Sequence, residues 1–163
     1  MSQTISRKNW LITSVSSGIG RSLAEAAVAE GHVVVGTVRK PEQIGEFEEL
    51  SPGRTMAVVL DVAKPGSVIS GMGAAASAAD GRIDGLVNNA GRSLVGAVEE
   101  TSVEEAHQVF EGNFFGQLNV TRAVLSAWKA TSASVVFPQP EAQAGGHLKS
   151  DRVGARGRDQ SNA

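Results

Sequence analysis

The most informative absence in this sequence of 163 residues is tyrosine, which does not occur once. Its side chains therefore include no phenol that could act as a general acid or base. Cysteine is absent as well, which excludes a disulfide framework and a thiolate metal site and fits a cytoplasmic location; we expect no metal. The formal net charge is −2, so we expect neither nucleic acid nor a membrane as a partner.

Long hydrophobic runs are also absent, and the polar start Met1–Lys8 resembles neither a signal peptide nor a membrane span. What is present is an alternation of short apolar runs with helical spacing, in a chain whose 41% hydrophobic content is enough for one core. Strands are expected at Trp10–Thr13, Val33–Val38, Met56–Leu60, Ile83–Asn88 and Ser134–Phe137. Helices are expected at Gly18–Glu30, Pro41–Leu50, Pro65–Ala79 and Ser102–Ala130, the last with a break near Gly112. This order predicts an α/β fold with a doubly wound parallel sheet of Rossmann type.

The alternation stops after Phe137. Residues 138–146 show no period, and Leu148 and Val153 are the sizeable apolar residues between His147 and Ala163. Such a composition cannot bury enough apolar surface to offset the entropy of ordering. The sequence therefore predicts an incomplete nucleotide-binding domain over residues 1–137 and a disordered tail over 138–163.

Gly18 and Gly20 stand between the first expected strand and the first expected helix. Glycine at such a turn lets the backbone approach a pyrophosphate, with the helix N–H groups facing the anion. An ordinary glycine-containing loop is the alternative. The strand–turn–helix context favours dinucleotide binding.

Thr13-Ser14-Val15-Ser16-Ser17-Gly18-Ile19-Gly20 and Asn88-Asn89-Ala90-Gly91 together resemble the classical short-chain dehydrogenase/reductase family, and the resemblance runs from about Trp10 to Phe137. It implies an NAD(P)-dependent oxidoreductase that acts on a hydroxyl or carbonyl group of an unidentified small molecule. The family motif has a glycine where this chain has Ser14. If that position needs a positive φ, serine strains the turn by about 1–3 kcal/mol.

The resemblance also implies which residues touch the cofactor. Arg39 resembles the basic residue that selects NADP over NAD, since a guanidinium can grip a 2′-phosphate; a solvated surface arginine is the alternative. Asp61 and Val62 match the adenine position, although Asp61 could instead cap the following helix. The implied cofactor-binding residues are Thr13, Ser14, Ser16, Ser17, Gly18, Ile19, Gly20, Arg39, Asp61, Val62, Asn89, Ala90 and Gly91.

Asn113 matches the catalytic asparagine of the family, which holds a water in a proton relay. The Tyr-x-x-x-Lys pair that should follow is missing: Lys149 has no tyrosine partner, and His107 is expected on an exposed helix face. Read out of frame, Phe137–Ala142 can encode Ser-Ser-Ala-Gly-Gly, which resembles the family sequence after the fifth strand. A frameshift near Val136, an isoform and a degenerate pseudoenzyme all agree with truncation after the fifth strand.

We therefore expect the NADP-binding portion of an oxidoreductase, inactive as it stands. The alternative is a non-enzymatic protein that pairs with an intact family member, or dimerises, through the region Ser102–Ala130. The apolar residues expected to recruit that partner are Phe114, Leu118, Val120, Val124 and Leu125.

Overall fold

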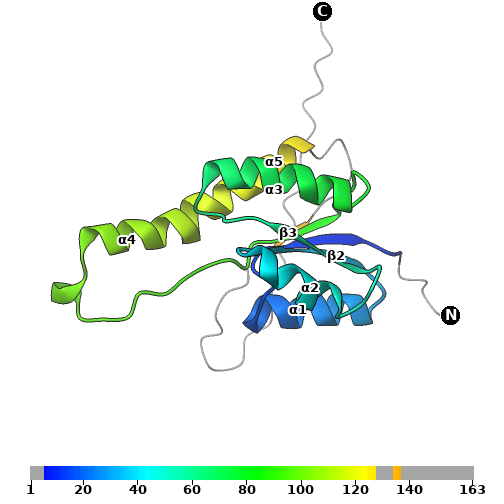
Figure 1. Ribbon diagram of the computed structural model, residues 1–163. Coiled ribbons are helices and arrows are strands. Elements are labelled where there is room, and N and C mark those ends of the chain that lie inside the picture. The colour runs from blue at the N-terminus through cyan, green and yellow to red at the C-terminus, as the bar shows by residue number, and fades with distance from the viewer. Residues whose placement is uncertain (1–5, 128–133, 137–163) are drawn as a thin grey trace, which may run out of the picture.

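The structure, a computed structural model, describes residues 6–127 and 134–136. Its centre is a five-stranded parallel sheet in the order β3-β2-β1-β4-β5 (Figure 1). The strands are β1 (Asn9–Ile12), β2 (Val33–Val38), β3 (Thr55–Val59), β4 (Gly85–Val87) and β5 (Ser134–Val136). The expected parallel α/β fold is thus confirmed. The expected tail at 138–163 lies outside the described residues.

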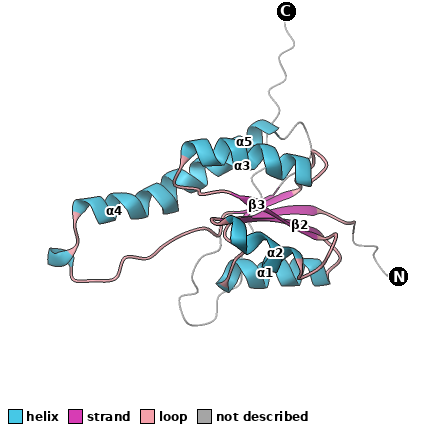
Figure 2. Ribbon diagram, viewed as in Figure 1, coloured by secondary structure: helices cyan, strands magenta, loops and turns pink. Residues whose placement is uncertain are grey.

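Helices cover both faces of the sheet (Figure 2). On one face lie α1 (Gly18–Ala29), a short 3₁₀ turn η1 (Pro41–Gln43) and α2 (Ile44–Glu48). On the other face lie α3 (Pro65–Ala78) and α5 (Gln117–Ala127). Each face has its own apolar cluster, one around Phe47 and Val34, the other around Leu11 and Leu86. β2 contributes residues to both clusters, and all of its residues are buried, as its nearly continuous β-branched run predicts.

The expected helix after β4 begins with a 3₁₀ turn, η2 (Val98–Glu100), followed by α4 (Val103–Phe110). Ser102 caps α4: its hydroxyl accepts a hydrogen bond from the amide of Glu105, whose carboxylate accepts one from the amide of Ser102. The expected break near Gly112 is wrong. A π-helical segment, η3 (Glu111–Gly116), instead joins α4 to α5 without interruption, and α4 reaches out beyond the sheet in Figure 1.

Part of the expected partner surface is wrong, because two of its five residues are buried in the core. Val120 and Val124 are 0% and 1% exposed and belong to the apolar cluster around Leu11 and Leu86. They cannot recruit another protein, because they already pack against the sheet and α3. Phe114, Leu118 and Leu125 remain exposed. Within the described residues, no helix is both long enough and apolar enough to cross a membrane.

Candidate cofactor site

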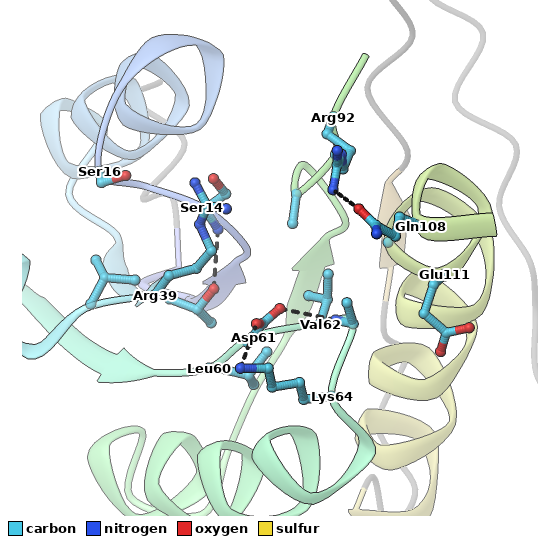
Figure 3. A pocket seen from close by; sticks show the side chains of 16 residues that line it. Ser14, Ser16, Arg39, Leu60, Asp61, Val62, Lys64, Arg92, Gln108 and Glu111 are labelled. Atoms are coloured by element: carbon cyan, nitrogen blue, oxygen red, sulfur yellow. Dashed lines mark hydrogen bonds and ion pairs between the residues drawn. The ribbon is translucent and has the colours of Figure 1, made fainter. Parts of the chain in front are cut away.

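A pocket of about 360 Å³ opens where the strands β1 to β4 reach their carboxyl ends (Figure 3). The chain runs from β1 outward to β2 and β3 and then returns to place β4 on the other side of β1. Open α/β sheets bind ligands at such a switch in strand order. The pocket is lined by Ser14, Ser16, Thr37, Val38, Arg39, Leu60, Asp61, Val62, Ala63, Lys64, Ala90, Gly91, Arg92, Gln108, Glu111 and Gly112.

The turn after β1 forms one end of the pocket. Ser14 has φ 62°, so the non-glycine residue of the motif occupies the left-handed region, which is the condition under which serine strains the turn. The amide of Ser14 donates to Thr37 Oγ1 at 3.1 Å, and the next amide donates to the carbonyl of Thr37 at 3.0 Å. These bonds hold the turn against the end of β2.

Gly20 holds α1 close to this turn. A Cβ atom at this position would overlap the carbonyl oxygen of Ser14 and the side-chain amide of Asn89. Only glycine lets the first turn of α1 approach the loop so closely. The helix begins next to the pocket, and Ser17 at its N-cap places no side-chain oxygen on the first amides, which leaves these donors for a ligand.

Thr13 and Asn89 brace the turn from below. Thr13 Oγ1 accepts hydrogen bonds from the amides of Asn89 at 2.9 Å and Ala90 at 2.8 Å. Asn89 Nδ2 donates to the carbonyl oxygens of Thr13 at 3.0 Å and Ser14 at 3.1 Å. The side chains of Thr13 and Asn89 thus hold the turn after β1 against the segment after β4. Neither residue lines the pocket.

The charged residues of the pocket lie at the ends of β2 and β3. Arg39 is exposed and projects beside Ser14 in Figure 3; no described residue forms an ion pair or hydrogen bond with its guanidinium. Asp61 Oδ1 accepts from the amide of Ala63 at 3.1 Å, and Oδ2 lies 3.7 Å from Lys64 Nζ. The helix-capping alternative is not observed, because Lys64 is the N-cap of α3 and receives no side-chain cap.

The opposite wall comes from the loop after β4 and from the helix that follows. Arg92 Nη1 donates to Gln108 Oε1 at 3.1 Å (Figure 3). Asn113 Oδ1 accepts from the amide of Arg92 at 2.9 Å, and Asn113 Nδ2 donates to its carbonyl oxygen at 2.8 Å. Both polar atoms of the expected catalytic side chain are therefore engaged by backbone, and Asn113 stands behind the pocket wall.

The structure brings seven expected cofactor residues to the pocket: Ser14, Ser16, Arg39, Asp61, Val62, Ala90 and Gly91. Ser17, Gly18 and Ile19 instead lie exposed around the start of α1. Lys64, Gln108 and Glu111 were missed by sequence reasoning. Gln108 and Glu111 are three residues apart on one helix, a spacing that puts them on one face, but nothing in the sequence indicates which face meets the pocket. His107 is exposed on α4, as expected.

A family model described as short chain dehydrogenase matches residues 8–139. The chain therefore belongs to the short-chain dehydrogenase/reductase family. It is 38% identical over 115 residues to a 3-ketodihydrosphingosine reductase of Bacteroides thetaiotaomicron. It is also similar to a solved short-chain dehydrogenase from Streptomyces avermitilis, with a TM-score of 0.75 and 41% identity over 83% of this chain.

Another similar structure is a 3-ketoacyl-(acyl-carrier-protein) reductase from Brucella melitensis complexed with NADH, with a TM-score of 0.68 and 30% identity over 74% of this chain. The chain spans 50% of the length of each of these two solved proteins and 40% of the length of the Bacteroides reductase. Family members bind NAD(P). The family match over residues 8–139 includes every residue that lines the pocket.

Proposed function

We propose that this chain binds NADP in the pocket at the carboxyl ends of the strands, as the cofactor-binding part of an oxidoreductase acting on a hydroxyl or carbonyl group. The observation that carries the proposal is Arg39, an exposed cation at the pocket with no partner among the described residues. A carboxylate at the end of β2 would repel a 2′-phosphate, whereas a guanidinium binds it with two hydrogen bonds.

The other residues fit a dinucleotide. The uncapped start of α1 next to the Ser14 turn supplies backbone donors for a pyrophosphate. Gly20 lets the first turn of α1 pack directly against that turn, where a Cβ would overlap the carbonyl oxygen of Ser14. Asp61 has an oxygen whose one partner in the described chain is the flexible Lys64, so it can accept a hydrogen bond from an adenine amino group. NADP, when bound, would supply the redox chemistry.

We further propose that the 163 residues do not transfer hydride by themselves. No tyrosine occurs among them, and general acid–base catalysis typically contributes about 10²–10⁴-fold in rate. The assay follows NADPH oxidation in the presence of a panel of ketones and aldehydes. We expect no measurable turnover, and a rate within about tenfold of a full-length relative would contradict the proposal.

The cofactor proposal is tested by Arg39→Asp, with Arg54→Asp as the matched control. Arg54 is also an exposed arginine, but it lies at the amino end of β3, the opposite end of that strand from the pocket. Calorimetric titration of each variant with NADP and NAD gives the ratio of the two dissociation constants. We expect Arg39→Asp to remove or reverse the preference for NADP and Arg54→Asp to keep it. An unchanged ratio in Arg39→Asp would show that Arg39 does not hold the 2′-phosphate.

A second candidate function is favoured by the outer face of the helix that follows β4. Phe114, Leu118 and Leu125 are 58%, 36% and 51% exposed, an apolar surface that suits pairing with another family member. Co-purification of the chain with a full-length relative tests this role. Phe114→Asp should abolish the pairing, whereas Arg39→Asp should leave it intact; the opposite pattern would contradict pairing through this face. We place either activity in the cytoplasm.

A further inference from the structure

One stripe of polar residues joins the helix after β4 to the segment Asn88–Arg92, which forms the pocket wall. Asn113 binds the backbone of Arg92, with bonds of 2.9 and 2.8 Å. Gln117 Nε2 donates to the carbonyl oxygen of Ala90 at 3.4 Å. Thr121 Oγ1 accepts from Asn88 Nδ2 at 2.9 Å. We call these three side-chain contacts, made by Asn113, Gln117 and Thr121, the polar ladder.

The spacing of the polar ladder is regular on both sides. Its helix residues are four apart, and the residues they bind are two apart along the segment Asn88–Arg92, in the opposite direction. Four residues of α-helix advance about 6 Å, and two residues of chain in a strand conformation advance about 6.6 Å. The segment after β4 turns at Asn88, where the amide of Asn89 donates to the carbonyl oxygen of Val87 at 3.0 Å. The two repeats are still similar enough in length for successive rungs to form.

The π-helical segment keeps the rungs in line. Four residues of α-helix rotate by slightly more than one turn, because a turn holds about 3.6 residues. A π-helix, closed by i→i+5 hydrogen bonds, holds more residues per turn, so four residues rotate by less than one turn. The segment Glu111–Gly116 contains Asn113, and α5 contains Gln117 and Thr121. The two rotations offset each other, and Asn113 and Thr121 face the same segment.

The rungs are also connected to one another and to the pocket. Thr121 Oγ1 donates to the backbone carbonyl oxygen of Gln117 at 2.7 Å, so the hydroxyl that binds Asn88 is itself held by the residue that forms the next rung. At Gly116 the helix approaches Val62 so closely that a Cβ would lie 2.8 Å from the carbonyl oxygen of Val62. A movement of the helix would therefore displace both walls of the pocket, one at Val62 and the other at Arg92.

We propose that the polar ladder is a cooperative positioning device that fixes the wall formed by Ala90, Gly91 and Arg92, with Asn113, Gln117 and Thr121 as positioning residues. Thr121, the rung farthest from Arg92, then controls the order of Arg92 although it lies outside the pocket lining. Its effect on NADP affinity rests on the proposed function; its effect on the Arg92 backbone does not.

The first test needs no cofactor. Amide hydrogen exchange at Arg92 is measured by NMR in the parent chain, Asn113→Ala, Thr121→Val and Thr121→Ser, with Ser126→Ala as the control. The hydroxyl of Ser126 on α5 donates to the carbonyl oxygen of Ala123 in its own helix and, among the described residues, has no other partner. We expect exchange at Arg92 to rise about tenfold in Asn113→Ala and about threefold in Thr121→Val. It should stay at the parent rate in Thr121→Ser and Ser126→Ala.

Parent-like exchange at Arg92 in a folded Thr121→Val chain would overturn the proposal, because the rungs would then act independently. Should Asn113→Ala fail to fold, the Thr121→Val and Thr121→Ser pair still decides the question. A parent-like exchange rate at Arg92 in Thr121→Ser would show that the hydroxyl group of Thr121, and not the volume of its side chain, orders Arg92.

The second test measures NADP dissociation constants against a matched loss of stability. Val124→Ala shortens a buried core side chain of the same helix. It should lower the melting temperature without changing a residue of the polar ladder. We expect Thr121→Val to weaken NADP binding about fivefold and Val124→Ala to change it less than twofold. Equal weakening in both variants would mean that Thr121 acts through stability alone. A parent chain that binds no NADP would refute the proposed function, while the exchange experiment would still decide the ladder.

Discussion

Ser14 occupies a backbone conformation that favours glycine, and replacing it should stabilise the chain. Its φ of 62° lies in the left-handed region, which costs a residue with a Cβ about 1–2 kcal/mol. Glycine removes this cost but adds freedom to the unfolded chain, which lowers the free energy of unfolding by about 0.4–1 kcal/mol. The net expectation for Ser14→Gly is a gain of about 0.5–1 kcal/mol.

The assay is thermal melting with and without NADP. For a chain of this size, 1 kcal/mol shifts the melting temperature by about 2–4 °C, so Ser14→Gly should melt about 1–4 °C higher. NADP should add a larger shift to the variant than to the parent, because Ser14 lines the pocket.

Ser17→Gly is the matched control, since Ser17 has an extended backbone, φ −166°, and makes no side-chain cap. Glycine relieves no strain there and should lower stability by a few tenths of a kcal/mol. If Ser14→Gly melts as low as Ser17→Gly and NADP stabilises it no more than the parent, the strain reasoning is refuted.

Two further predictions concern packing and pH. Gly20→Ala should lose about 1–3 kcal/mol of stability and weaken NADP binding, because its Cβ overlaps the carbonyl oxygen of Ser14; Gly45→Ala, with open space at Cβ, should be neutral or stabilising, and melts of both variants check this. Burial raises the pKa of Asp84, but hydrogen bonds from Arg82 and from a backbone amide outweigh it and lower the pKa overall. A carboxyl with a lowered pKa stabilises the fold above its unfolded pKa, near 3.9, and loses this effect as the pH falls through the folded value. The difference in melting temperature between the parent and Asp84→Asn should therefore shrink below about pH 4, and a constant difference would contradict the assignment.

The sequence predicts the strands and most helices well, because their apolar spacing depends on local burial. The β-branched run Val33–Val38 matches β2 to the residue. The expected strand Ile83–Asn88 is longer than β4 at both ends, where the side chain of Asp84 accepts from the amide of Asn9 and that of Asn88 donates to Thr121. These long-range bonds leave no mark in the local pattern.

The turn after β1 was also accessible from the sequence, since its residue types carry the backbone requirement. The π-helical segment was not, because it depends on bonds between Asn113 and a backbone segment about twenty residues away. Likewise, Lys64 and Gln108 reach the pocket only through the way the loop after β3 and α4 meet in three dimensions. The local periodicity of the sequence contains no information on how this loop and this helix pack against each other.

The most direct test of the account is calorimetric titration of the parent chain with NADP and, separately, with NAD. The account predicts saturable binding of one NADP per chain, tighter than NAD, with the difference lost in Arg39→Asp. The absence of saturable heat at millimolar NADP, where a standard binding free energy of about −4 kcal/mol would still be detected, would contradict the claim that this pocket holds the cofactor.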